Sequence, residues 1–454
     1  MSRPRFVLAC FSSVGFLLFA TGSLYPQAPA PGAVTFAPQG DPAYRPQILG
    51  TTVHFGSVRP LGYTSVPRAS DQLHQIGATS YRDGIAWASF DFANPAVPRM
   101  AQKRRIMDFL PVAGVRPLLI LGTPPNEPAM QGAPFSDQQL AQFGAYVQGA
   151  VRLTQSYRPM FEVWNEYNMR VGTQRPAAKL VGPGDPSDPR AASHYVVLAR
   201  AAVTAAKAAN PGVPVIVGAV GEDPGWGWTR AIVRGGALNG AAGLSVHLYN
   251  QCARPDQRTA PEMIARLEQL QALLKGDRGG RETPMYVTEF GWPTGSGRCE
   301  VSTGRQAYNL AHFILQSSAL PWLRGAWIYE LKDEGQDTSD FEQNFGVFGF
   351  DDQPKPAACF VREARAIVAG ARSVAFRQLR PDVFALRAVM PDRQIAAVWT
   401  SRDAPAGHVQ LSGRPTVRTM CGQPLTAGSP VPVTPAPIVA SYPLGQAITV
   451  RVSG

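Results

Sequence analysis

Short runs of β-branched and aliphatic residues alternate with longer amphipathic or alanine-rich stretches through the middle of the chain. This alternation predicts strands joined by helices and therefore a parallel sheet. The eight expected strands are Thr52–Gly56, Thr79–Asp83, Val115–Leu121, Met160–Trp164, Val213–Ala219, Gly243–Leu248, Pro284–Glu289 and Arg324–Tyr329. The clearest expected helices are Asp137–Leu153, Ala191–Ala209, Pro261–Leu274, Thr303–Ser318 and Pro354–Ala369.

Eight strand–helix units over about 320 residues predict an α/β fold, a (β/α)8 TIM barrel over residues 50–370. A doubly wound open sheet is the alternative, but no glycine-rich phosphate fingerprint follows the first strand. From residue 371 the pattern changes to short alternating runs separated by turn residues. It predicts a small all-β, sandwich-like domain over residues 371–454. Its expected strands are Val374–Gln378, Val383–Ala388, Ile395–Thr400, His408–Leu411, Ile438–Ser441 and Ala447–Val452.

The N-terminus has the pattern of an export signal. Two arginines in the first five residues precede an uncharged stretch, Phe6–Gly22, and then a segment rich in proline and alanine. We therefore expect residues 1–30 to be a signal peptide or an N-terminal membrane anchor, with a proline-rich linker over residues 31–49. The apolar run of about 17 residues is at the lower limit for a membrane span, so both alternatives stay open. Either one predicts an exported protein, periplasmic or secreted, associated with the inner membrane if the segment is not cleaved.

Composition narrows the classes of function. With 45% hydrophobic and 17% charged residues in 454, the chain is a folded globular protein rather than a disordered one. The net charge of +11 comes mostly from scattered arginines without a basic tract, so we expect no nucleic-acid partner. The charge leaves only a weak indication of an anionic substrate or membrane surface. We expect a monomer.

Four cysteines follow the N-terminal segment, which itself contains Cys10. An even number in an exported chain allows two disulfides. We expect Cys252 to pair with Cys299, because they follow the sixth and seventh strands on neighbouring loops. Cys359 and Cys421 would then tie the barrel to the C-terminal domain. The chain has no CxxC or HExxH motif, so we expect no metal and no cofactor.

Two carboxylates follow strand ends, where barrel enzymes carry their reactive groups. Glu166 lies in Trp164-Asn165-Glu166 after the fourth strand, and Glu289 ends the seventh. Such a pair is what glycoside hydrolysis requires: Glu166 would be the general acid/base and Glu289 the nucleophile. We expect the two carboxyl groups to be about 5–5.5 Å apart, the spacing of retaining enzymes.

These motifs resemble the clan A (4/7) retaining glycoside hydrolases. Within the clan the chain is most similar to glycoside hydrolase family 39, and it resembles the Psl-type endoglycosidases encoded with exopolysaccharide clusters. The resemblance covers residues 50–370 and implies cleavage of a β-linked polysaccharide at internal bonds. It also implies that Arg82 lies near the nucleophile and that Tyr249 donates a hydrogen bond to Glu289. Asn165 would bind the sugar 2-hydroxyl, and His247 would lie beside the acid/base or the sugar. Trp327 would form the aromatic floor of the sugar site.

Other side chains are candidates because aromatic faces stack on the C–H side of a pyranose. Trp87, Trp226, Trp228 and Trp292 are candidates for further sugar subsites, and His54 is a candidate sugar ligand at the end of the first strand. Two other classes of function compete. A non-catalytic carbohydrate-binding or assembly protein of the envelope would not need both glutamates. An ester or amide hydrolase would need a nucleophile or metal motif such as GxSxG, which is lacking.

Overall fold

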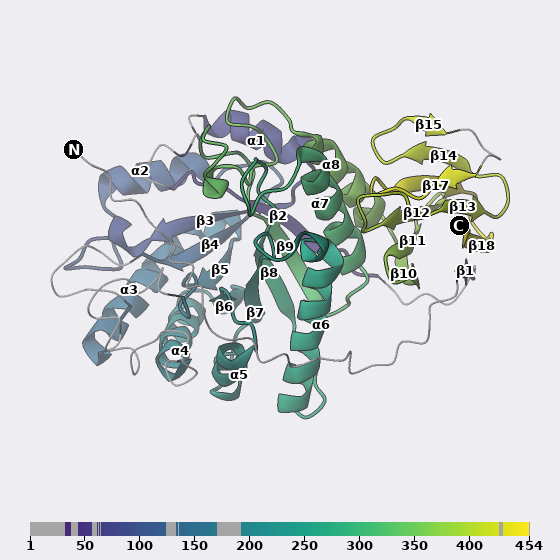
Figure 1. The fold of residues 1–454 in the computed structure, drawn as a ribbon. Helices are drawn as coiled ribbons and strands as arrows, with labels where there is room; N and C mark the ends of the chain where they lie inside the picture. Colours follow the sequence, from purple (N-terminus) through teal and green to yellow (C-terminus); the bar gives the residue numbers. More distant parts are fainter. Residues whose placement is uncertain are drawn as a thin grey trace.

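The computed structural model describes residues 32–37, 44–56, 61, 63, 65–123, 133–134, 136–169, 192–425 and 430–453. Its larger part is a closed barrel of eight parallel strands surrounded by helices, as predicted (Figure 1). The barrel strands are β2 (Ile48–Thr52), β3 (Ser80–Ala86), β4 (Arg116–Gly122), β5 (Met160–Val163), β6 (Val215–Val220), β7 (Gly243–Leu248), β8 (Met285–Phe290) and β9 (Leu323–Ile328). The helices are α1 (Val66–Gln75), α2 (Met100–Phe109), α3 (Asp137–Thr154), α4 (Ala192–Ala209), α5 (Gly227–Arg234), α6 (Ala260–Asp277), α7 (Thr303–Ser317) and α8 (Pro356–Ala369).

The first barrel strand is displaced from its predicted position. The expected strand Thr52–Gly56 is in fact the last residue of β2 followed by a turn. The hydrophobic pattern continues past the strand because Val53 and Phe55 are buried in the core although they are not in the sheet. His54 therefore lies beyond the end of β2 rather than inside a strand.

A layer of large side chains closes the lower half of the barrel. Trp327 packs there against Leu118, Met160, Ile216 and Tyr286, and its indole nitrogen donates to Ser80 Oγ at 3.0 Å. Glycines at positions 50 and 325 leave room for the ring, because a Cβ at either would lie within 3 Å of it. The ring and these glycines fill the barrel interior on the side where the strands begin.

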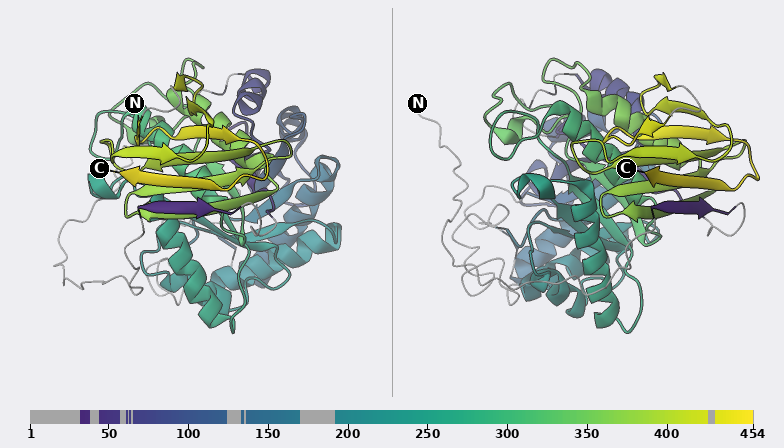
Figure 2. Two further views of the ribbon diagram at one scale, coloured as in Figure 1. Left: turned by 90° about the vertical axis from the view of Figure 1, so that its right-hand side faces the viewer. Right: turned by 45° about the vertical axis from the view of Figure 1, so that its right-hand side comes forward.

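The C-terminal domain consists of two antiparallel sheets, as predicted. One has the order β10 (Ser373–Arg380), β11 (Val383–Val389), β12 (Gln394–Thr400), β17 (Ile438–Tyr442), β14 (Thr416–Thr419), β15 (Pro424–Leu425). The other has the order β1 (Ala33–Phe36), β18 (Ile448–Ser453), β13 (His408–Leu411), β16 (Val431–Pro432). Figure 2 shows β1 in purple along the edge of the yellow sheet.

Strand β1 corrects the predicted linker of residues 31–49. Residues 33–36 pair in antiparallel register with β18, so this part of the linker is the edge strand of a domain more than 330 residues away in sequence. Residues 48–49 already belong to the barrel. The predicted signal or anchor over residues 1–30, with Cys10, lies outside the described residues. Within the part of the chain that the structure describes, no helix has the length and apolar character to cross a membrane.

The two domains are joined by side chains of α7 and α8. A disulfide links Cys359 of α8 to Cys421, and Arg305 of α7 pairs with Asp403 at 2.9 Å. His312 of α7 is fully buried, stacks on Trp399 and contacts the Pro435 carbonyl oxygen at 2.8 Å through Nε2. The β-domain is thus fixed to the barrel by covalent, ionic and packed contacts.

The buried His312 predicts a stability that falls in acid. Burial lowers its pKa to about 3, against a partial opposing effect of the hydrogen bond to Pro435. The unfolded chain, with an ordinary histidine pKa near 6.5, binds the extra proton between these values, so the free energy of unfolding decreases as the pH falls from about 6.5 toward 3. By pH 4 the loss is on the order of 3 kcal/mol.

Denaturant unfolding of wild type and His312→Gln at pH 7 and pH 4 measures this contribution. We expect the difference between the two pH values to be smaller in the variant by about 3 kcal/mol. The exposed His408→Gln is the matched control and should behave as wild type. An equal acid dependence in wild type and His312→Gln would contradict the assignment.

Candidate active site

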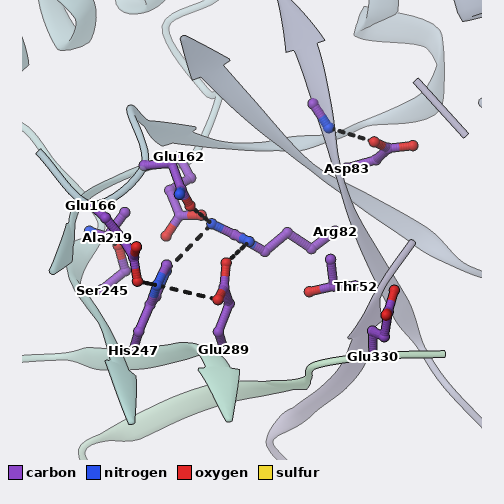
Figure 3. A network of polar contacts seen from close by, with 12 residues as sticks. Thr52, Arg82, Asp83, Glu162, Glu166, Ala219, Ser245, His247, Glu289 and Glu330 are labelled. Atoms are coloured by element: carbon purple, nitrogen blue, oxygen red, sulfur yellow. Dashed lines mark hydrogen bonds and ion pairs between the residues drawn. The ribbon is translucent and has the colours of Figure 1, made fainter. Parts of the chain in front are cut away.

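Arg82 is the centre of a buried polar network in the upper half of the barrel (Figure 3). It is 1% exposed, and its guanidinium donates to Glu162 at 2.6 Å, to Glu289 at 2.6 Å and to Asn165 at 2.8 Å. Arg82 lies inside β3 rather than at its end, which corrects the expected position. Because its side chain points into the barrel, it still reaches the residues at the ends of β5 and β8.

His247 lies between the two candidate catalytic carboxylates. Its Nδ1 is 2.8 Å from Glu166 Oε1 and 3.4 Å from Glu289 Oε2. Tyr249 donates to the same Glu289 oxygen at 2.7 Å. Ligand atoms of Glu166, His247 and Glu289 all lie within 4.8 Å of one another. The structure therefore brings these four predicted side chains into one site.

The backbone at Glu166 is held in an unusual conformation. Trp164 and Glu166 both have positive φ, 68° and 47°, a region that costs non-glycine residues of order 1–3 kcal/mol. The Glu166 amide donates to the Ala219 carbonyl at 2.8 Å. Gly221 leaves space beside the carboxyl group, because a Cβ there would be 3.1 Å from Glu166 Cδ and 2.5 Å from Met169 Cγ. The end of β6 and the residue that follows it thus position Glu166.

The electrostatics keep Glu289 ionised. Burial by itself would raise its pKa, but the positive charges of His247 and Arg82 and the hydrogen bond from Tyr249 outweigh burial, so the pKa is lowered. Conversely, burial disfavours the charged form of His247, while Glu289 and Glu166 raise its pKa. Such a charged carboxylate beside a second carboxyl group is a frequent mark of acid–base chemistry.

A second group of side chains adjoins this network at the ends of β2 and β9. His54 Nε2 is 3.1 Å from both Glu330 and Glu334. Burial raises the pKa of Glu330 to about 7, even though His54 pairs with it. The half-buried Tyr329 ring makes edge contacts with His54 and with Tyr249. His54 is therefore at the same end of the barrel as Glu289, where a sugar ligand was predicted.

Among the residues that the structure describes, two groups have the ligand types and spacing that could hold a metal ion: His54 with Glu330 and Glu334, and Glu166 with His247 and Glu289. In both groups the histidine is already within ion-pair distance of the carboxylates, which accounts for the arrangement without an ion.

The predicted role of Trp327 as the floor of the sugar site is not compatible with its position. Trp327 is fully buried in the lower layer of the barrel. Side chains in a strand alternate in direction and lie at different heights, and a pattern of hydrophobic residues does not reveal which layer an inward residue joins. Tyr329, two residues further along, has the partial exposure and the location expected of that aromatic residue.

The other tryptophans proposed for sugar subsites are also core residues. Trp87 stacks on Tyr146 at a ring distance of 5.8 Å, and the Trp292 nitrogen donates to Asn250. All four have exposed fractions of 1% or less, so none offers a ring face to a sugar. These residues are Trp87, Trp226, Trp228 and Trp292.

The structure joins Cys252 and Cys299 in a disulfide, the predicted pair. It links the loops after β7 and β8, close in sequence to Tyr249 and Trp292. Sequence reasoning missed Glu162, Tyr329 and Glu330. The signal for Glu162 was a charged residue inside the apolar strand Met160–Val163, and Glu330 was a carboxylate directly after the eighth strand.

Comparison with known proteins agrees with this architecture. No protein-family model matches the chain. A probable glucan endo-1,3-beta-glucosidase of Arabidopsis thaliana is 31% identical over 83 residues, 17% of this chain and 24% of that protein. The match thus spans about a quarter of the length of this curated relative.

The solved structures that resemble the chain share nearly its whole fold. A family 39 glycoside hydrolase from Bacteroides cellulosilyticus WH2 has a TM-score of 0.64 at 18% identity, covering 90% of this chain and 81% of that one. The family 39 enzyme of Xanthomonas axonopodis pv. citri has 0.59 at 15%, covering 91% and 96%. A monomeric beta-xylosidase of Caulobacter crescentus CB15 has 0.59 at 14%, covering 91% and 98%.

The chain therefore has the fold of the clan A glycoside hydrolases, a (β/α)8 barrel. More particularly, its likeness to the two family 39 structures covers 90% and 91% of the chain and so extends beyond the barrel into the β-domain. At these identities the likeness establishes the fold, and the activity has to be argued from the site.

Proposed function

We propose that this protein is a retaining glycoside hydrolase, with Glu289 as nucleophile and Glu166 as general acid/base. The observation that carries the proposal is the pair itself: oxygens of the two carboxylates within 4.8 Å of each other at the ends of β5 and β8. Retaining enzymes have carboxyl groups about 5–5.5 Å apart, whereas inverting enzymes need about 6.5–9.5 Å to admit a water molecule.

The geometry supports a double displacement. In the first step Glu289 attacks the anomeric carbon while the bond to the leaving oxygen breaks, and that oxygen takes the proton of Glu166. In the second step Glu166 removes a proton from water, the water oxygen bonds to the anomeric carbon, and Glu289 leaves as a carboxylate. Arg82 and Tyr249 hold Glu289 charged and oriented, and Asn165 is held by Arg82 where it can bind the sugar 2-hydroxyl.

We further propose a β-linked polysaccharide as substrate, cut at internal bonds. Its support is the identity of two similar proteins: one is a probable glucan endo-1,3-beta-glucosidase and one a beta-xylosidase. Action outside the cytoplasm on an exopolysaccharide, by a monomer, is part of the same proposal. Two disulfides fit an oxidising compartment.

Aryl β-glycosides of glucose, xylose and mannose, together with soluble β-1,3-glucan, test this function. We expect release of the aryl group from at least one of them, and chain shortening of the glucan before monosaccharide appears if cleavage is internal. Glu289→Gln protein purified in the same way is the blank. If Glu289→Gln released the aryl group as fast as wild type, the activity would not come from the proposed site.

Gly221→Ala is expected to lower kcat/KM on the aryl glycoside by about 10-fold, because small misplacements of a catalytic group are costly. The added methyl group would lie 2.5 Å from Met169 Cγ and 3.1 Å from Glu166 Cδ, so both side chains have to shift. Gly225→Ala is the matched control in the same loop, since a Cβ there meets nothing within 4 Å. Thermal unfolding of both variants separates a displaced carboxyl from a loss of folding. Equal kcat/KM in the two variants would contradict the packing argument.

A further inference from the structure

A second cavity lies at the opposite end of the barrel from the two catalytic carboxylates. It has a volume of about 350 Å³ and is lined by the first residues of the barrel strands. Ile48, Met160 and Leu323 begin β2, β5 and β9, and each lies on its wall. The buried layer around Trp327 separates this cavity from the Arg82 network.

Three arginines converge on this cavity. Arg45 precedes β2, Arg116 begins β4 and Arg324 is the second residue of β9. All three act electrostatically on Tyr286, which is 8% exposed and whose pKa burial raises against their charge. Three segments far apart in sequence therefore each place an arginine side chain at the wall of the same cavity.

Among the described residues, no opposing charge lines the cavity beside these arginines. The described residues that line the cavity include no aspartate or glutamate. The side chains of Arg45 and Arg324 have no ion pair or hydrogen bond within the described part of the chain. Arg116 donates through Nε to the Arg158 carbonyl at 2.7 Å, which fixes its side chain and leaves its terminal nitrogens available. Holding three like charges together is unfavourable unless an anion accompanies them.

The chemistry of the arginines indicates the kind of anion. Guanidinium groups bind phosphate oxygens in a bidentate manner, and three of them from separate directions match a group with several equivalent oxygens and up to two charges. A single carboxylate offers two oxygens and one charge. The cavity is open to solvent at the base of the barrel, so a phosphate attached to a larger molecule can enter it.

We propose that the cavity formed by Arg45, Arg116 and Arg324 is a binding site for a phosphate group. The group comes from a soluble phosphate ester or from the head group of a membrane lipid. Occupation of the site does not require the glycosidase activity, because the Trp327 layer separates the two ends of the barrel.

The test measures binding of inorganic phosphate to the purified full-length chain by calorimetry in low-salt buffer, with chloride at matched ionic strength as reference. We expect the double variant R45Q/R324Q to bind phosphate at least about tenfold more weakly, because hydrogen bonds to charged groups are lost. The double variant R414Q/R451Q removes the same charge from exposed positions of the β-domain and should bind as wild type. Hydrolysis of an aryl glycoside, where present, should be unchanged in both.

Co-sedimentation with vesicles distinguishes the two sources. Binding to phosphatidylglycerol vesicles but not to phosphatidylcholine vesicles, lost in R45Q/R324Q, identifies a lipid head group. Phosphate binding without vesicle binding identifies a soluble phosphate ester. Equal phosphate affinity of the two double variants, or no binding by wild type beyond that of chloride, would overturn the proposal.

Discussion

Glu289→Gln is expected to reduce kcat on an aryl β-glycoside by at least about 10⁴-fold, because the amide cannot form the glycosyl–enzyme bond. Glutamine has nearly the same shape and can still accept from Tyr249 or Arg82, which limits the structural change. The loss should therefore appear in kcat rather than in KM. Steady-state kinetics together with thermal unfolding measure both effects.

A second variant, Glu289→Ala, gives with azide a signature that a merely destabilised protein lacks. In Glu289→Ala the space left by the side chain admits azide, which attacks the anomeric carbon from the face of the missing nucleophile. The product should be a glycosyl azide of inverted configuration. The exposed Glu262→Gln in α6 is the control and should keep wild-type kinetics. A residual kcat above a few per cent in Glu289→Gln would contradict the role of this residue.

The second large effect is expected for Glu166→Ala, and it depends on the leaving group. General acid catalysis contributes about 10²- to 10⁴-fold, and its loss matters most when the departing oxygen needs a proton. We expect a severe loss of kcat/KM with a weakly acidic alcohol as leaving group and a small loss with 2,4-dinitrophenolate. Azide should restore turnover and give an azide of retained configuration, the opposite of the Glu289→Ala product.

A loss that is equal for all leaving groups would contradict the acid role of Glu166. It would indicate instead that the change disturbs His247, which contacts Glu166 at 2.8 Å. His247→Ala separates these explanations, because it removes the contact while leaving the acid in place.

The barrel could be predicted because its signal is repeated. Eight buried strands and their helices each have a period set by the backbone, and errors at one end, as at Thr52–Gly56, do not change the count. The edge strand β1 could not be predicted in the same way. Its four residues are ordinary for a linker, and only the distant partner β18 makes them a strand.

In the active site, too, some residues could be predicted from the sequence and others could not. Glu166, Glu289, His247 and Tyr249 could be found because each is a polar residue at or just after a strand end. Trp327 shows the limit, since an inward-facing tryptophan serves equally as a core residue or as a sugar platform. Its height in the barrel depends on strand stagger, which a sequence pattern does not contain.

The central claim is most directly tested by the anomer that the enzyme first releases. Hydrolysis of the best aryl β-glycoside, followed by proton NMR within the first minutes, distinguishes the product before mutarotation. Double displacement through Glu289 predicts that the β-anomer appears first and the α-anomer only later. Initial release of the α-anomer would contradict the close carboxylate pair as the catalytic device.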